Sequence, residues 1–135
     1  MAHLNPYLTF NGNCRQAMEF YQACLEGELS LTTVSDSPMK DQMPKEAQNA
    51  VMHSLLRSGD ITLMASDQMS PGTLVNGNTI TLCIIGNSKA ELEPFFTKLA
   101  AEGNVFQPLQ ETFFGVYGAL TDKFGINWMF QADKA

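Results

Sequence analysis

The stretch Glu111–Gln131, E-T-F-F-G-V-Y-G-A-L-T-D-K-F-G-I-N-W-M-F-Q, decides the fold that we expect for this chain. Two apolar runs flank the turn Thr121–Gly125, and polar residues fall at alternate positions within the runs. Successive side chains of a β-strand point to opposite faces of its sheet. The pattern therefore predicts a hairpin with one face packed on a core and the other face lining something else.

Length, charge and cysteine usage narrow the class of protein. The chain has 135 residues, which is typical of one domain. Its net charge is −6 and its eight Lys and Arg residues are scattered, so we expect no nucleic-acid partner. No apolar run approaches the ~18 residues that span a bilayer, and the first residues do not resemble a signal peptide. With three Cys and no C-x-x-C pair, we expect a cytoplasmic globular protein with free thiols and no membrane partner.

Hydrophobic periodicity predicts the same series of elements twice. Alternation of apolar and polar residues indicates strands, and apolar residues at three-and-four spacing indicate helices. Both series have the order β-α-β-β-β. The predicted elements are strand 4–10, helix 14–25, strands 28–35, 51–57 and 61–66, then strand 78–85, helix 89–101, a short strand from 105 and the opening hairpin.

Weak self-similarity supports the repeat. Gly59-Asp-Ile-Thr-Leu-Met-Ala65 matches Gly125-Ile-Asn-Trp-Met-Phe130. We expect an α+β fold in which two βαβββ modules form a curved mixed sheet around a cavity, with the helices on the convex face. The predicted domain organisation is a single domain, 1–135, with module one at 1–67, a linker at 68–77 and module two at 78–132.

Several segments resemble the PhnB-like proteins, and together they span nearly the whole chain in order. They are Pro6–Tyr21, Val51–His53, Leu63–Asp67 and Pro108–Met129. The resemblance implies the vicinal oxygen chelate superfamily, which includes glyoxalase I and bleomycin-resistance proteins, with paired βαβββ modules and usually a homodimer. Members are often labelled 3-demethylubiquinone-9 3-methyltransferase, but this sequence has no Gly-rich loop of the kind that nucleotide-type cofactors need.

The resemblance also locates a possible metal site. Proteins of this superfamily usually hold a divalent ion with His, Glu or Gln side chains from four strands, and the ion binds substrate oxygens. The equivalent positions fall near Asn5, Met64 (or Leu63), Thr79 and Met129. Two thioethers, an amide and a hydroxyl do not suit a hard divalent cation. We therefore expect no catalytic metal and no other cofactor, with a divalent metal as the alternative.

Strand alternation gives a separate prediction of the ligand-binding residues. One face of each strand is aliphatic or aromatic and suits a helix, whereas the other mixes hydroxyl, amide and sulfur groups. The mixed faces either line a pocket or face water. The predicted ligand-binding residues are Asn5, Tyr7, Met64, Thr79, Thr81, Tyr117, Asn127 and Met129.

Two residues are candidates for proton transfer, and each has a structural alternative. His53 is either a proton carrier or a structural histidine, since no second His or Cys stands at ligand spacing. Glu111, beside Phe113 and Phe114, is either a general base or a strand-end carboxylate bonded to backbone amides. Asp122 is typical of a hairpin turn.

These observations predict a small-molecule-binding protein of the PhnB-like family that works without a catalytic metal. The resemblance adds a homodimer to this prediction. Two alternatives remain open: a divalent-metal-dependent lyase, isomerase or dioxygenase of the same superfamily, and a structural homodimer subunit with a vestigial cavity. Whether the protein is an enzyme is left open by the sequence.

Overall fold

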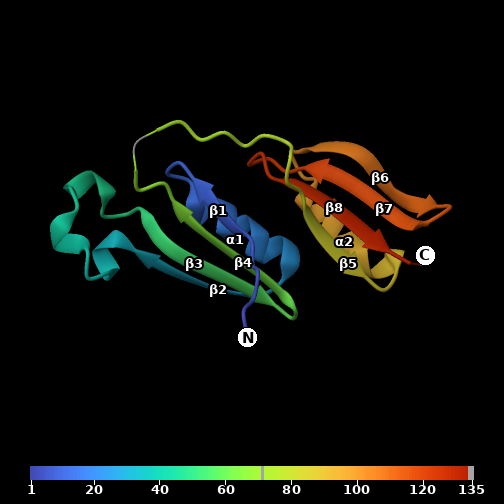
Figure 1. The fold of residues 1–135 in the computed structure, drawn as a ribbon, viewed down its shortest axis with the longest axis horizontal. Helices are drawn as coiled ribbons and strands as arrows, with labels where there is room; N and C mark the ends of the chain where they lie inside the picture. Colours follow the sequence, from blue (N-terminus) through green and yellow to red (C-terminus); the bar gives the residue numbers. More distant parts are fainter. Residues whose placement is uncertain (71, 134–135) are drawn as a thin grey trace. The chain divides into compact units, whose positions relative to one another are not determined.

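The computed structural model describes residues 1–70 and 72–133. Pro71, in the predicted linker, and Lys134 and Ala135, at the end of the predicted domain, lie outside the described residues. The chain divides into two compact units, 1–74 and 75–135. Within the described residues, each unit contains a four-stranded sheet and an α-helix in the order β-α-β-β-β (Figure 1).

The first unit has the strand order β1-β4-β3-β2. Strands β1 and β4 are parallel, and the other neighbouring pairs are antiparallel. Three short 3-10 helices lie between β2 and β3. The elements are β1 (Tyr7–Phe10), α1 (Cys14–Leu25), β2 (Glu28–Thr33), η1 (Val34–Asp36), η2 (Lys40–Gln42), η3 (Lys45–Ala47), β3 (Val51–Ser58) and β4 (Ile61–Asp67).

The second unit repeats this topology with the strand order β5-β8-β7-β6. Strands β5 and β8 are parallel, and the opening hairpin forms the antiparallel pair β7 and β8. The elements are β5 (Leu82–Gly86), α2 (Lys89–Leu99), β6 (Asn104–Thr112), β7 (Gly115–Thr121) and β8 (Asn127–Ala132). The predicted α+β class with two βαβββ modules is confirmed, and each module builds its own mixed sheet.

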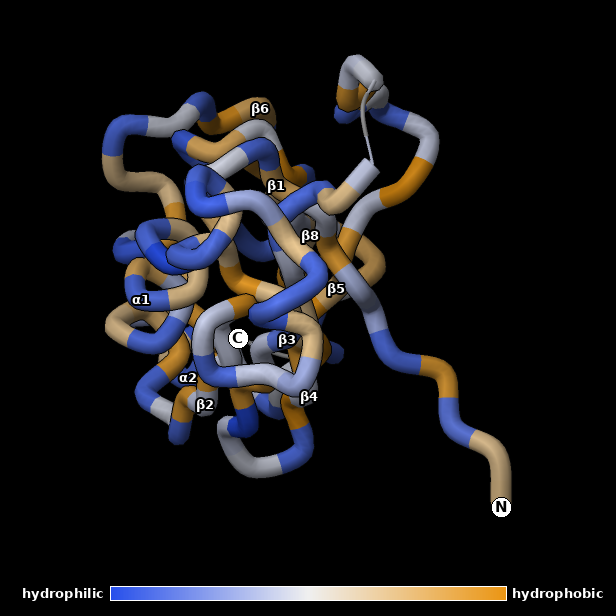
Figure 2. The backbone as a smooth tube through the Cα atoms, turned by 90° about the vertical axis from the view of Figure 1, so that its left-hand side faces the viewer, coloured by the Kyte–Doolittle hydropathy of each residue, from blue (hydrophilic) through white to orange (hydrophobic). Residues whose placement is uncertain are grey.

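Each helix packs on one face of its own sheet. The Sγ atom of Cys14 in α1 lies 3.8 Å from the Oγ atom of Ser54 in β3. In α2, the ring of Phe96 meets that of Phe130 in β8 edge-on, with 5.2 Å between centroids. Hydrophilic and hydrophobic residues alternate along α1 (Figure 2), and its buried residues face the sheet. Among the described residues, neither helix is long and apolar enough to cross a membrane.

Two predicted strands begin later than the sequence pattern indicated. Strand β1 starts at Tyr7, because Pro6 has no backbone N–H and contributes only its carbonyl, which accepts from the Met64 amide at 3.2 Å. Strand β5 starts at Leu82, because β8, with which it pairs, begins only at Asn127. The segments before both strands therefore lie outside the sheets.

The start of α1 is held by a carboxylate from far along the chain. Asn13, at the N-cap position, makes no side-chain cap hydrogen bond. Instead, Asp67 at the end of β4 accepts from the backbone amides of Gly12 at 2.9 Å and Cys14 at 3.0 Å. In α2 the cap is local, since the Ser88 hydroxyl accepts from the Glu91 amide at 3.2 Å.

Candidate functional site

The face of the first sheet opposite α1, here called the first outer face, carries the mixed side chains that the alternation predicted. On β4, Leu63 and Ala65 are buried, whereas Met64 between them is half-buried. The register partners of Met64 are Tyr7 on β1 and Leu55 on β3. These three residues form an apolar strip across three adjacent strands.

Tyr7 and His53 meet on the first outer face. The Tyr7 hydroxyl lies 3.4 Å from His53 Nδ1, and their ring centroids are 6.0 Å apart. The two residues come from β1 and β3, which flank β4, so their side chains lean across the middle strand. Both are exposed, with 46% of Tyr7 accessible.

This face also carries residues that the sequence pattern did not single out. Leu55 and Arg57 alternate with buried neighbours along β3 and share the side of His53. On β2, Thr32 is the register partner of His53 and Glu28 that of Arg57. Because residues two apart on a strand share a face, Leu55 and Arg57 could have been assigned to this face together with His53.

The face of the second sheet opposite α2, here called the second outer face, carries a similar mixture. Met129 on β8 lies between its register partners Cys83 on β5 and Ala119 on β7. In the next row along these strands, Tyr117 pairs with Gln131. Partial burial raises the pKa of the Cys83 thiol, so it stays protonated at neutral pH.

Exposed aromatic side chains adjoin the second outer face. Phe114, in the turn between β6 and β7, has its ring centroid 6.1 Å from that of Tyr117 and 5.2 Å from that of Phe113. Phe113 is fully exposed and Phe114 is 59% exposed. The turn thus adds apolar surface beside Tyr117.

Met64 and Met129 occupy equivalent positions in the two modules. Each lies on the last strand of its module, half-buried between two buried residues. Each pairs with the first strand of its module, through Tyr7 in one case and Cys83 in the other. The structure therefore supports the internal match that the sequence suggested.

The residues at these positions do not fit a hard divalent cation. The side chains in register with the two methionines are a phenol, a thiol, and the aliphatic Leu55 and Ala119. Carboxylates and imidazoles, the usual protein ligands of such ions, are absent from both rows. In residues 1–70 and 72–133, no three His, Cys, Asp or Glu side chains gather as a metal site would need.

Four of the predicted ligand-binding residues have different surroundings from those expected. Asn5, Thr79 and Thr81 are exposed and precede β1 or β5, rather than lying on them. The Asn127 side chain is engaged within its own unit, because Oδ1 accepts from the Thr121 hydroxyl at 2.7 Å and Nδ2 donates to the Gly77 carbonyl at 3.1 Å.

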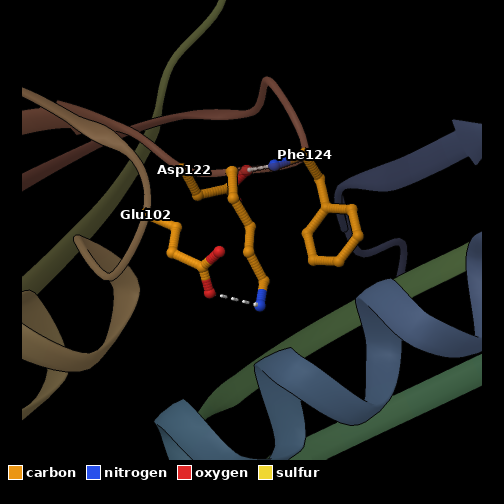
Figure 3. Close-up of polar contacts among 4 residues, drawn as sticks. Glu102, Asp122 and Phe124 are labelled. Carbon is orange, nitrogen blue, oxygen red and sulfur yellow. Dashed lines mark hydrogen bonds and ion pairs between the residues drawn. The ribbon is translucent and has the colours of Figure 1, made fainter.

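The two acidic residues considered in the sequence, Glu111 and Asp122, have different surroundings. Glu111 pairs with Val116, which is buried on the helix side of the second sheet, whereas the adjacent Gln110 pairs with Tyr117. Glu111 therefore does not share the second outer face. Asp122 is 3% exposed and its Oδ1 accepts from the Phe124 amide at 2.7 Å (Figure 3), as expected for a turn aspartate.

A hollow of about 410 Å³ lies on α2. It is lined by Ala90, Glu93, Pro94, Thr97 and Lys98, and it contains none of the predicted site residues. Because these residues belong to a single helix, the hollow is a shallow surface feature. The outer faces of the two sheets remain the stronger candidates for a functional surface.

Comparison with known proteins places the chain in a family. Residues 2–131 match the family model described as 3-demethylubiquinone-9 3-methyltransferase. The chain is 34% identical to Protein YjdN of Escherichia coli strain K12, over 97% of this chain and 95% of that protein.

Two solved structures are similar over almost the full length. The crystal structure of protein PA1353 from Pseudomonas aeruginosa has 35% identity and a TM-score of 0.85, covering 100% of both chains. The putative 3-demethylubiquinone-9 3-methyltransferase, PhnB protein, from Bacillus cereus has 22% identity and a TM-score of 0.76, covering 99% of this chain and 100% of that one. The chain therefore belongs to the 3-demethylubiquinone-9 3-methyltransferase family.

Proposed function

We propose that this protein binds a small molecule on the outer face of its sheets and does so without a catalytic metal. The observation that carries the proposal is the Tyr7–His53 contact above the half-buried Met64. Polar groups placed beside apolar surface are characteristic of small-molecule sites. The sequestering resistance proteins of the superfamily provide a precedent by resemblance.

The chemistry of the first outer face defines the kind of ligand. The apolar strip of Tyr7, Met64 and Leu55 crosses the middle of the face. Hydroxyl side chains lie on both sides of this strip, since Thr9 pairs with Ser66 and Thr62 precedes Met64 by two residues. A compact ligand with an apolar body and a few hydrogen-bonding groups suits this arrangement.

Methyl transfer, which the family description names, is not part of this proposal. A methyl donor built on a nucleoside needs a loop whose backbone amides approach it closely, usually a Gly-rich turn between a strand and a helix. The corresponding turn after β1 is Asn11-Gly12-Asn13, and its Gly12 amide is already bonded to Asp67 at 2.9 Å. That amide is therefore engaged within the fold.

A thermal-shift screen against metabolites tests the binding function. A ligand that binds only the folded protein at one hundred times its Kd stabilises it by about 2.7 kcal/mol, so a hit raises Tm in a saturable way. Met64→Arg would place a charge in the apolar strip and should abolish the shift. Thr97→Arg, on the exposed side of α2, is the matched control and should retain it. If no metabolite raises Tm, or if Met64→Arg still responds, the proposal fails.

Metal analysis separates this function from a metal-dependent enzyme. Protein incubated with Zn²⁺, Ni²⁺, Mn²⁺ or Fe²⁺ and then desalted should retain far less than one equivalent of metal. One tightly held equivalent, lost on substitution of Met64 or Met129, would support a metal-dependent lyase, isomerase or dioxygenase instead. Metal analysis of the double variant Met64→Leu/Met129→Leu provides the background value.

We further propose that the protein works in the cytoplasm as a homodimer. Its three cysteines are all free thiols in the described residues, as is usual in a reducing compartment. The homodimer follows from the family resemblance. Light scattering coupled to gel filtration tests it directly, and a monomer mass at working concentration would contradict it.

A further inference from the structure

We propose that Tyr7 and His53 form the polar anchor of the ligand site, in which Tyr7 positions His53 and His53 Nε2–H donates to a carbonyl or carboxylate oxygen of the ligand. This inference rests on the proposed function and specifies the ligand chemistry: an apolar molecule with an acceptor oxygen. It assigns distinct roles to two residues of the first outer face.

The contact between the two side chains spans a strand. Tyr7 is the register partner of Met64, and Met64 is in turn the partner of Leu55, two residues beyond His53. The phenol and imidazole therefore reach diagonally over β4 to bring the hydroxyl within 3.4 Å of Nδ1. Their rings are inclined by 32°. The contact fixes which imidazole nitrogen faces Tyr7 and which faces away.

The proton positions follow from the chemistry of the two groups. A neutral imidazole has one N–H donor and one acceptor nitrogen. A phenolic hydroxyl is more acidic than a neutral imidazole N–H, so Tyr7 is the donor in this pair and Nδ1 the acceptor. The imidazole proton then resides on Nε2. His53 thus presents a donor directed away from Tyr7.

The surroundings of the pair select an apolar ligand. Met64 and Leu55 are half-buried beside it, and Tyr7 presents the exposed part of its ring. On β3 and the neighbouring β2, the charged residues that share the face of His53 are Arg57 and Glu28, which are register partners of opposite sign. Their charges offset each other, so both a neutral carbonyl and a carboxylate are compatible with the site.

Three probes of similar size test the acceptor oxygen: benzoate, acetophenone and toluene. Titrations followed by NMR of the intact protein should show the His53 imidazole resonances moving saturably with benzoate and acetophenone. We expect both to bind about five- to tenfold more tightly than toluene, the effect of one added hydrogen bond. Comparison of benzoate with acetophenone shows whether the site prefers an anion. Equal affinities for all three probes, or no saturable movement of His53, would overturn the assignment.

Variants of both residues separate positioning from packing. His53→Gln places an amide N–H near Nε2 and should retain the preference for oxygenated probes. His53→Asn places its amide near Nδ1 and should lose about five- to tenfold in their affinity, with toluene binding unchanged. Tyr7→Phe keeps the aromatic ring. It should move the Nδ1 resonance of His53 and weaken the binding of the oxygenated probes only.

Circular dichroism of each variant checks the fold, which should persist because both side chains are exposed. If His53→Asn still binds benzoate and acetophenone more tightly than toluene, the inference is refuted. If a ligand from the metabolite screen binds equally well to His53→Asn, the proposed binding function stands while this anchor is wrong.

Discussion

The indole Nε1–H of Trp128 donates to Asp122 Oδ2 at 2.8 Å, within the hairpin of β7 and β8. The other carboxylate oxygen, Oδ1, accepts from the backbone amides of Phe124 at 2.7 Å and Ile126 at 3.1 Å. Asp122 is 3% exposed, and so its charge is stabilised by these donors instead of water. One buried carboxylate thus ties the turn to the aromatic core of the second unit.

Asp122→Asn should destabilise the second unit by about 1–3 kcal/mol. Asparagine keeps one acceptor oxygen for the turn amides but directs an NH₂ group at the indole N–H. Urea unfolding followed by Trp128 fluorescence measures the loss. Asp60→Asn, in the exposed turn between β3 and β4, is the matched control and should change stability little. Equal effects of the two substitutions would contradict the role of the buried carboxylate.

Asp67 should be equally important to the first unit. Its carboxylate is 4% exposed and accepts from three backbone amides, those of Gly12, Cys14 and Val51. Asp67→Asn replaces one acceptor with a donor, so the start of α1 or of β3 must lose its partner. Hydrogen exchange should then accelerate at the Cys14 amide or at the Val51 amide, whichever loses its acceptor, with little change in Ser66→Asn. Unchanged protection of both amides would refute this account.

Gly118 should tolerate no larger residue. A Cβ atom at this position would lie 2.9 Å from Cε2 of Phe96 and 3.0 Å from Cα of Leu109. Gly118→Ala is therefore expected to cost about 1–3 kcal/mol through overpacking beneath α2. Ala119→Ser, at the next residue and on the outer face, is the control. In chemical unfolding, combining Gly118→Ala with Phe96→Leu should cost less than the sum of the single changes, whereas strict additivity would exclude this contact.

The parts of the fold that depend on local periodicity could be predicted from the sequence. The half-buried Met129 between buried Trp128 and Phe130 follows from alternation alone. The starts of β1 and β5 depend on pairing with distant strands, and so the sequence pattern placed Asn5 and Thr79 on strands that do not include them. The carboxylate that holds the start of α1 was not predictable from local pattern for the same reason, since Asp67 is 53 residues away from Cys14.

The candidate site was predictable only in outline. Tyr7, Met64 and Met129 were assigned to the mixed faces because their neighbours two residues away share that character. The meeting of Tyr7 with His53 was not predictable, since it depends on β1 and β3 flanking β4. The face that Glu111 occupies was also not predictable, since it depends on the hairpin register in which Thr112 pairs with Gly115 and Glu111 with Val116.

Stability should fall in alkaline solution because of Cys14. Burial raises the pKa of this thiol to about 11, the Ser54 hydrogen bond lowers it, and the charge of Asp67 raises it further. The unfolded chain loses the Cys14 proton near pH 9 while the folded chain retains it. The stability that the protonated Cys14 contributes is therefore fully present below about pH 9 and is lost as the pH rises through the pKa of the folded protein. The loss amounts to ~2 kcal/mol by pH 11.

Cys14→Ala isolates this contribution from other groups that titrate at high pH. The difference in unfolding free energy between wild type and Cys14→Ala, measured in urea at pH 8 and pH 10.5, should shrink at the higher pH. Cys83→Ala, which removes an exposed thiol, should show a smaller pH-dependent difference. A wild-type advantage over Cys14→Ala that is constant from pH 8 to 10.5 would show that the folded protein ionises this thiol as readily as the unfolded chain.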